Sequence, residues 1–166
     1  MQITGAYALV SIVDNKLIGV RDPMGIRPLV LGKVGTAYIL ASETCALDII
    51  GADYIRDIAP GELVVIDEKE VSSQMIAAEK PSRFCIFEYI YFARPDSTLE
   101  GRSVYQARKQ IGAELAGETA VPSDLVIPVP DSGVPAALGY AQASGIPFEL
   151  GICLLYTSDA ADEKRC

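Results

Sequence analysis

The sequence contains no histidine among its 166 residues. This absence excludes Ser-His-Asp and Cys-His catalytic arrangements, because both need an imidazole as general base. It also excludes most zinc sites, whose ligands usually include histidine or closely spaced cysteines. Any chemistry performed by this chain therefore relies on carboxylates, backbone amides, a cysteine, or groups outside these residues.

Basic residues and long apolar runs are also scarce. Fourteen Lys and Arg stand against 22 Asp and Glu, a net charge of −8, which argues against nucleic acid and anionic membranes as partners. No run approaches the ~20 apolar residues of a membrane-spanning helix, and the N-terminus lacks the features of a signal peptide. The four cysteines are scattered without a C-x-x-C pair. We therefore expect a cytoplasmic protein.

The first 80 residues alternate between apolar runs and turn signals, a pattern that predicts an antiparallel meander with one short helix. The helix is expected at Glu43–Ile50, with Ser42 as its cap and Gly51 as its end. Little in this region supplies the second layer that such a meander must pack against, and the polar residues 68–83 indicate a loop. The expected strands are Tyr7–Val13, Leu17–Arg21, Pro28–Val34, Ala37–Ala41, Tyr54–Ile58 and Leu63–Asp67, the last two forming a pair.

The capping-box sequence Ser103–Gln106 predicts a helix that has Ser103 as its cap and ends at Gly117. Four of its residues share one face and predict the side that packs against the rest of the protein. These residues are Val104, Ala107, Ile111 and Leu115.

A different pattern follows residue 124. A strand at Leu125–Val129, a helix at Val134–Ser144 and a strand at Phe148–Ile152 form a βαβ unit, which implies parallel strands. The fold class predicted for the whole chain is therefore mixed: antiparallel α+β structure followed by the beginning of an α/β domain.

The loop of the βαβ unit is a candidate anion site. Pro130-Asp131-Ser132-Gly133 opens a helix, where backbone N–H groups and the helix dipole attract negative charge. Ser132 offers a hydroxyl, and Gly133 allows a phosphate to approach the backbone. Asp131 would repel a bare phosphate, so its presence favours magnesium or a ligand hydroxyl as a companion. The alternative is an ordinary helix cap.

Two other features stand out. The loop Arg21–Pro28 predicts a turn held by an Arg–Asp pair, or alternatively a wall for an anionic substrate. The run FCIFEYIYFARPDS, from Phe84, suits a buried strand, but such a strand leaves Glu88 unexplained. The apolar neighbours of Cys45 and Cys85 indicate core positions for both.

Several stretches together resemble one known family. They are GAYALV, LIGVRDPMGIRPLVLG, ILASETCALDIIGADYIRDIAPGELVVI, CIFEYIYFARPDS and VIPVPDSG, between Thr4 and Ile152. In this order and spacing they are similar to glutamine phosphoribosylpyrophosphate amidotransferases, also called amidophosphoribosyltransferases. RDPMGIRPL alone is shared loosely with other glutamine amidotransferases, whereas FEYIYFARPDS narrows the resemblance to this family.

The resemblance implies a two-domain parent enzyme. Residues 1–80 would be the later half of a glutaminase domain of the N-terminal-nucleophile (Ntn) type, and residues 81–122 a junction strand and helix buried against both domains. Residues 123–152 would begin a phosphoribosyltransferase domain, and residues 153–166 look like a non-native tail. The implied reaction converts phosphoribosyl pyrophosphate, glutamine and water to 5-phosphoribosylamine, glutamate and pyrophosphate, the first step of de novo purine synthesis. The parent is expected to be a homo-oligomer.

The resemblance also implies roles for five residues. Asp131, Ser132 and Gly133 match the family's pyrophosphate-binding loop, which works with Mg²⁺. Tyr91 matches a tyrosine that lines the route of ammonia. Cys85 matches the first ligand of the 4Fe-4S cluster found in many bacterial members, but a cluster needs all its thiolates, so we expect none in this chain.

The sequence also departs from the family's pattern. It begins Met1-Gln2 in place of the cysteine that serves such enzymes as nucleophile, and the pattern breaks after Ile152. We therefore expect an internal fragment that is inactive by itself. The alternatives are another Ntn glutamine amidotransferase and a non-catalytic module that binds phosphoribosyl pyrophosphate.

Overall fold

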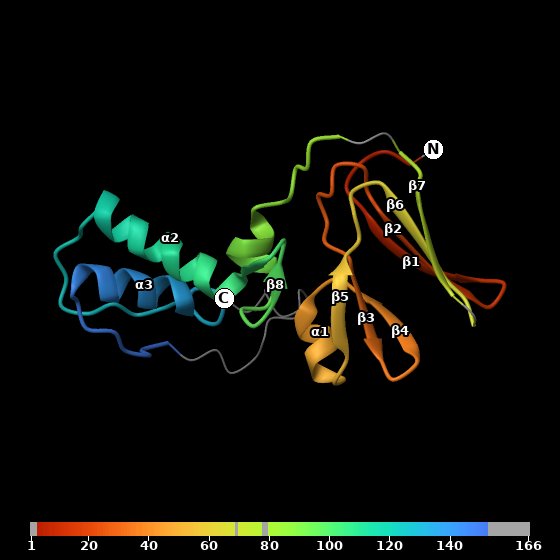
Figure 1. Cartoon of the computed structure of the whole chain (residues 1–166). Helices are drawn as coiled ribbons and strands as arrows, with labels where there is room; N and C mark the ends of the chain where they lie inside the picture. Colours follow the sequence, from red (N-terminus) through yellow and green to blue (C-terminus); the bar gives the residue numbers. More distant parts are fainter. Residues whose placement is uncertain (1–2, 69, 78–79, 153–166) are drawn as a thin grey trace, which may run out of the picture. The chain divides into compact units, whose positions relative to one another are not determined.

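A computed structural model describes residues 3–68, 70–77 and 80–152 of the chain. The chain divides into two compact units, Met1–Val104 and Tyr105–Cys166. Figure 1 draws the elements of both units. The functional domain limits inferred from the sequence stay predictions.

Unit 1 contains two antiparallel sheets that pack face to face. The first has the strand order β1-β2-β6-β7 and the second has the order β4-β3-β5. The strands of the first sheet are β1 (Ala8–Val13), β2 (Lys16–Arg21), β6 (Glu62–Ile66) and β7 (Val71–Met75), and those of the second are β3 (Val30–Val34), β4 (Ala37–Ala41) and β5 (Asp53–Asp57).

The core of unit 1 lies between these sheets. Leu29 and Leu31 from the second sheet and Val64 and Ile66 from the first belong to one buried cluster, together with Ile58. The short helix α1 (Thr44–Ile49) covers the other face of the second sheet with the side chain of Leu47. The layers are therefore helix, sheet and sheet.

Two strand expectations were wrong. β5 and β6 do not pair with each other, because the chain crosses from one sheet to the other between Asp57 and Glu62. The second sheet is thus the layer that seemed to be missing from residues 1–80. Part of the polar region 68–83 forms β7, which pairs with β6 from Ile66↔Val71 to Glu62↔Met75. Three of its five residues are polar, and four of the five are exposed at the edge of the sheet.

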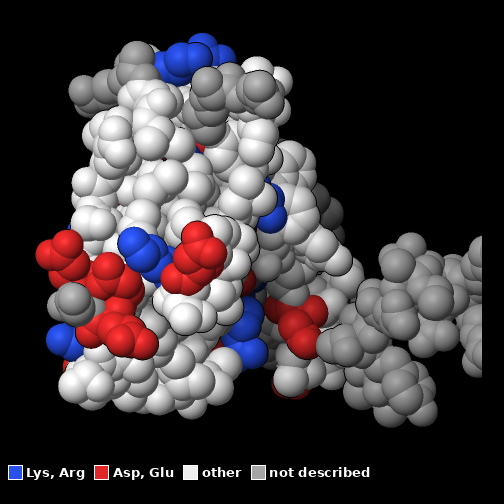
Figure 2. Space-filling view, turned by 90° about the vertical axis from the view of Figure 1, so that its right-hand side faces the viewer, with Lys and Arg blue, Asp and Glu red and all other residues white. Residues whose placement is uncertain are grey.

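The strand β1 forms the other edge of the first sheet and is largely uncovered. Its apolar side chains Leu9, Val10, Ile12 and Val13 are each between 44% and 77% exposed. Figure 2 views the molecule from the right-hand side of Figure 1, where the first sheet lies, and much of the surface seen there carries neither acidic nor basic side chains.

The aromatic run does not form the expected strand. Residues Glu88–Phe92 form a single π-helical turn, η1, and a small hairpin follows it, made of β8 (Thr98–Leu99) and β9 (Arg102–Ser103). Only Glu88 and Tyr89 of the turn are buried. The turn therefore contacts the rest of unit 1 through Glu88 and Tyr89, while its other aromatic residues stay exposed.

The helix α2 (Val104–Glu118) begins where the capping-box sequence predicts. Its buried positions, however, are Val104, Arg108, Gly112 and Ala116, whereas Ile111 and Leu115 are 45% and 50% exposed. The predicted apolar face was therefore wrong by part of a turn. The inward-facing positions instead include Gly112, whose lack of a side chain allows close helix packing.

Unit 2 is built on the contact between α2 and α3 (Val134–Ser144). A Cβ atom added to Gly112 would collide with the backbone of Ala136, and one added to Gly139 would collide with the backbone of Lys109. The two helices therefore approach to backbone contact at glycines. The predicted limits of α3 are confirmed, including its end at Gly145, which has φ of 73°.

The predicted βαβ connection is present in reduced form. Val126 and Phe148 form a parallel bridge, in which the Val126 N–H donates to Pro147 O and the Glu149 N–H donates to Val126 O. This pairing is one bridge and not two full strands. The chain direction is nevertheless the predicted one, so the segment before α3 runs parallel to the segment after it.

Candidate functional site

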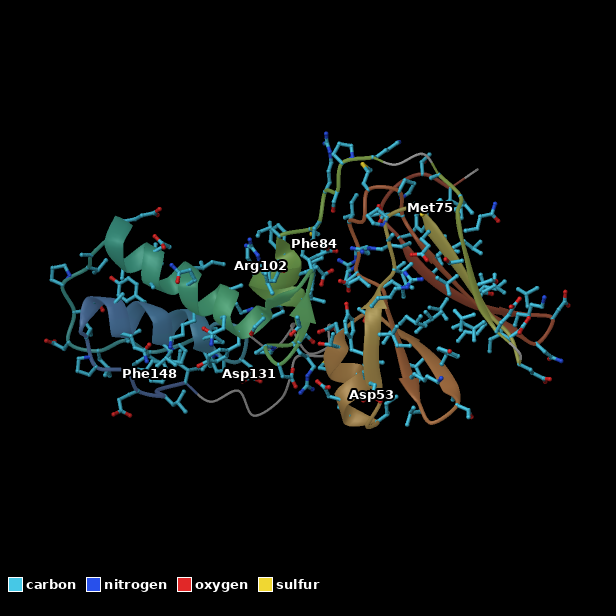
Figure 3. The ribbon with its side chains drawn as sticks, in the orientation of Figure 1. Asp53, Met75, Phe84, Arg102, Asp131 and Phe148 are labelled. Carbon is cyan, nitrogen blue, oxygen red and sulfur yellow. The ribbon has the colours of Figure 1, made fainter. Side chains whose placement is uncertain are left out.

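The loop Pro130–Gly133 leads directly into the N-terminus of α3 (Figure 3), with Asp131 exposed to solvent at its centre. The Val134 N–H donates to Asp131 O at 3.2 Å, and the Gly133 N–H donates to Val129 O at 3.2 Å. The loop is thus a tight turn held by its own backbone. This arrangement turns the loop directly into the helix N-terminus, the end that attracts anions.

Glycine is required at position 133 by the loop itself. A Cβ atom there would lie 2.6 Å from the carbonyl oxygen of Val129, closer than a real side chain tolerates. Gly133 is also the cap residue of α3, and no side chain makes a capping hydrogen bond there. The alternative prediction, that Ser132 serves only as a helix cap, was therefore wrong. The side chain of Ser132 is half-exposed and does not cap α3.

The loop that follows β2 was predicted to depend on an Arg–Asp pair, and this was only half right. Arg21 and Asp22 are both buried, but no ion pair joins them among the four found in the described residues. The carboxylate of Asp22 accepts hydrogen bonds from the N–H groups of Met24, Ile26 and Arg27. Each charged side chain therefore holds the loop by binding its backbone.

Arg21 also reaches beyond the loop. Its guanidinium donates to the carbonyl oxygens of Gly25, Arg27 and Ile58 and forms an ion pair of 2.6 Å with Glu100. A buried guanidinium needs such a complete set of acceptors. The alternative of a wall for an anionic substrate is not supported at Arg21, because its donors face protein acceptors.

The segment around Cys85 lies along this loop. The Arg83 N–H donates to Met24 O at 2.7 Å, and the Cys85 N–H donates to Ile26 O at 3.2 Å. The thiol of Cys45 is buried, as predicted, whereas Cys85 is only half-buried, and neither forms a disulfide. Within the described ranges no three histidine, cysteine, aspartate or glutamate side chains gather as a metal site. Because an iron-sulfur cluster needs four thiolates, these residues alone do not fit one.

A small cavity beside the turn η1 was not foreseen from the sequence. It has a volume of about 230 Å³, and Arg27, Glu43, Glu88 and Phe92 are among its lining residues. Glu88 is 3% exposed, and its Oε1 lies 2.9 Å from Nη1 of Arg27. The one signal in the sequence was a carboxylate within an apolar run, since a buried charge needs a partner.

Burial raises the pKa of the Glu88 carboxyl above its ordinary value. The positive charge of Arg27 acts in the opposite direction, and the nearby Glu43 adds to the increase. Glu43 itself accepts hydrogen bonds from the Ser97 hydroxyl at 2.8 Å and the Arg94 N–H at 2.7 Å. The cavity therefore brings two carboxylates and one guanidinium together next to η1.

The predicted site residues fall in different units. Asp131, Ser132 and Gly133 lie together in unit 2, while Cys85 and Tyr91 lie in unit 1. The side chain of Tyr91 is 64% exposed, so the structure shows no burial of this residue.

Among the described residues no helix is long and apolar enough to cross a membrane.

Comparisons with known proteins give a consistent result, although no family model matches the sequence. Over 156 residues, 91% of this chain, the sequence is 54% identical to an amidophosphoribosyltransferase of Rhizobium etli. It is 47% identical over 150 residues to the Bacillus subtilis protein of the same name and 52% identical over 151 residues to a chloroplastic one from Glycine max. The chain spans about a third or less of these relatives, namely 32%, 32% and 26% of their lengths.

The structural comparison covers almost the whole chain. A solved glutamine phosphoribosylpyrophosphate amidotransferase of Bacillus subtilis, complexed with ADP and GMP, matches 98% of this chain and 37% of its own, with a TM-score of 0.88 at 44% identity. A second solved structure, described as the allosteric regulatory enzyme of purine biosynthesis, matches with a TM-score of 0.85 at 43% identity. Sequence and fold agree, and the chain belongs to the amidophosphoribosyltransferase family.

Proposed function

We propose that this chain is the part of an amidophosphoribosyltransferase that links its two chemical steps. In the first step glutamine and water give glutamate and ammonia. In the second, ammonia displaces pyrophosphate from phosphoribosyl pyrophosphate and gives 5-phosphoribosylamine. The observation that supports this most strongly is the 54% identity over 156 residues, because an alignment of that length includes most of both units and not one motif alone.

Unit 1 supplies sheet structure for the glutamine half of the reaction. Its two packed antiparallel sheets agree with the later half of an Ntn-type glutaminase sandwich. The nucleophile is not among the proposed site residues of this chain, so the role of unit 1 is to form the scaffold and the exit from that site. Tyr91, exposed on η1, is our candidate for a residue along the route of ammonia.

Unit 2 supplies the pyrophosphate loop. The N-terminus of α3 attracts the negative charge of the pyrophosphate group, and Ser132 can donate a hydrogen bond to it. Mg²⁺, when bound with the substrate, neutralises phosphate charge and makes the carboxylate of Asp131 acceptable next to it. Holding this leaving group in place promotes departure of pyrophosphate as ammonia attacks.

Three further proposals concern the whole parent protein. We propose a cytoplasmic location for the bacterial type of parent, a homo-oligomeric state, and a role for Cys85 as one ligand of a 4Fe-4S cluster whose other ligands are cysteines of the full-length parent only. The support for the last is the half-buried, unbridged thiol. Iron and sulfide analysis of a full-length parent with Cys85→Ser would test it.

A chimera tests the proposed function. Residues 4–152 of this chain replace the aligned segment of the Bacillus subtilis enzyme, and the purified protein is assayed for glutamate and for 5-phosphoribosylamine. We expect both products to form at rates within about tenfold of the parent enzyme. A folded chimera that forms neither product would contradict the proposal.

The same chimera separates the two alternatives. If the chain comes from another kind of glutamine amidotransferase, the chimera should release glutamate without forming phosphoribosylamine. If it comes from a binding module, the chimera should bind magnesium phosphoribosyl pyrophosphate tightly without turnover. The expectation that these 166 residues alone turn over neither substrate stays a prediction, which assays on the isolated chain would check.

A further inference from the structure

The side chain of Arg27 contacts both ends of the π-helical turn. At the first residue of η1, its Nη1 lies 2.9 Å from Oε1 of Glu88. At the last residue, its guanidinium carbon lies 5.0 Å from the ring centroid of Phe92, within the range of a cation–π contact. One side chain therefore fixes where η1 starts and where it ends relative to the sheets of unit 1.

Arg27 is itself held firmly. Its N–H donates to the carboxylate of Asp22, and its carbonyl accepts from Nε of Arg21. Because Arg21 and Asp22 are about 1% exposed or less, the backbone from which Arg27 extends is set by buried groups. The backbone of Arg27 is thus fixed, and its side chain, 41% exposed, extends from it to η1.

Glu88 depends on this support. Its Oε1 is buried and makes no hydrogen bond within the described residues, so the Arg27 guanidinium is the positive charge that compensates it. A buried carboxylate without such a charge is costly. Removal of Arg27 would therefore favour movement of Glu88 toward solvent, and η1 would move with it.

The contacts of Phe92 extend this arrangement to Tyr91. The rings of Tyr91 and Phe92 pack edge to face with centroids 6.0 Å apart, and the ring of Phe87, the residue before η1, lies 6.2 Å from that of Phe92. Tyr91 is 64% exposed, so few other contacts restrict it. Its orientation follows from Phe92, and that of Phe92 follows from Arg27.

We propose that Arg27 and Glu88 are positioning residues that orient Tyr91 for the transfer of ammonia. The transfer step rests on the proposed function, whereas the positioning rests on the contacts alone. A π-helical turn is a rare element that often marks functional positions, and here a charged pair holds it while its aromatic side chains stay exposed. Arg27 and Glu88 touch no reacting atom in this scheme.

The test measures coupling in the chimera, as phosphoribosylamine formed per glutamate released. We expect Arg27→Met to lower this ratio about tenfold and Glu88→Gln to lower it less, because Gln keeps the shape of the side chain. Arg27→Lys keeps the charge and should restore part of the ratio. A purely structural role would reduce both products together and leave the ratio unchanged.

Two comparisons complete the test. Lys33→Met removes another cation lying over an aromatic ring, 4.8 Å from the centroid of Tyr38, and should leave the ratio as it is. Tyr91→Leu should lower the ratio, and adding Arg27→Met to it should have no further effect. An unchanged ratio in Arg27→Met, or losses that multiply in the double variant, would overturn the proposal.

A readout that needs no activity keeps positioning separate from function. 3-Fluorotyrosine at position 91 of the folded chimera reports the surroundings of that ring by ¹⁹F NMR. We expect its resonance to move in Arg27→Met and Glu88→Gln and to stay in place in Lys33→Met. If the chimera is inactive but the resonance moves, the proposed function fails while positioning stands. A resonance that stays in place in all three variants refutes positioning.

Discussion

The guanidinium of Arg21 and the carboxylate of Glu100 lie 2.6 Å apart, although they are 79 positions apart along the chain. Arg21 belongs to the first sheet, and Glu100 sits in the turn between β8 and β9 with φ of 48°. The pair therefore ties the segment that follows η1 back to the loop after β2. Through this ion pair the RDPMGIRPL motif, which begins at Arg21, helps to hold the hairpin that follows η1 in place.

Replacing Arg21 should be severely destabilising. Arg21→Met leaves three carbonyl oxygens without their donor and removes the partner of Glu100. Loss of a buried charged donor costs roughly 3–5 kcal/mol. Urea denaturation of the chain measures the loss, and Glu100→Gln is the matched comparison, expected to cost only about 1 kcal/mol because Glu100 is partly exposed. Equal effects of the two variants would contradict this account.

The helix contact of unit 2 gives a second prediction. Gly112→Ala and Gly139→Ala each place a methyl group against the backbone of the facing helix, so α2 and α3 must separate. We expect each variant to lose about 1–3 kcal/mol of stability. Gly117→Ala is the control, because nothing lies within 4 Å of its Cβ position.

Gly117→Ala should therefore be neutral or stabilising by up to about 1 kcal/mol, from the helix propensity of alanine. Thermal unfolding followed by circular dichroism compares the three variants. A Gly112→Ala protein as stable as the Gly117→Ala protein would show that the helices do not meet as described.

Glu62 and Glu88 should give opposite dependences of stability on pH. Burial alone would raise the pKa of Glu62. The side chain of Arg56 and the N–H of Ala59 donate hydrogen bonds to its carboxylate, and their combined effect holds the pKa below its ordinary value. Its stabilisation is present above the unfolded-state pKa of about 4.3 and is lost as pH falls through the folded-state pKa. The raised pKa of Glu88 works the other way, and its contribution is lost as pH rises through the folded-state value.

Denaturation between about pH 3 and pH 7 separates the two groups. Glu62→Gln should flatten the loss of stability on acidification, whereas Glu88→Gln should raise relative stability toward neutral pH. A Glu88→Gln curve parallel to that of the unaltered chain would show that this carboxyl has an ordinary pKa.

The proposed pyrophosphate loop, Pro130–Gly133, gives a prediction about binding. In the chimera, Ser132→Ala should weaken binding of magnesium phosphoribosyl pyrophosphate by about 1 kcal/mol, the value of one hydrogen bond, or roughly fivefold in Kd. Gly133→Ala should weaken it far more, because its methyl group meets Val129 O at 2.6 Å and displaces the loop. Calorimetry measures both, and normal binding by Gly133→Ala would contradict the loop geometry.

The sequence predicted those parts of the fold that local patterns determine. The limits of α3 followed from Gly133 and Gly145, and the β1–β2 turn followed from Asp14 and Asn15, both of which have positive φ. Local patterns could not predict which sheet each strand joins. A short connection such as the one between β5 and β6 can link two paired strands of one sheet, or it can carry the chain from one sheet to the other, as it does here. Likewise β7 is polar, as edge strands often are, and resembled a loop.

The candidate site divides in the same way. The Pro130–Gly133 loop could be placed because strand, turn and helix signals are contiguous there. The Arg27–Glu88 pair could not, since its members are 61 positions apart in the numbering and only the fold brings them to 2.9 Å. The exposure of Tyr91 on a π-helical turn was also unforeseen, because an aromatic run indicates a buried strand by default.

The most direct measurement of the central claim is growth. A bacterial strain that lacks its own amidophosphoribosyltransferase needs added purine, and the chimera with residues 4–152 of this chain is expressed in it. We predict growth without purine, and no growth when Gly133→Ala is introduced. A chimera that accumulates as folded protein but never supports growth without purine would contradict the claim that this chain performs the work of an amidophosphoribosyltransferase segment.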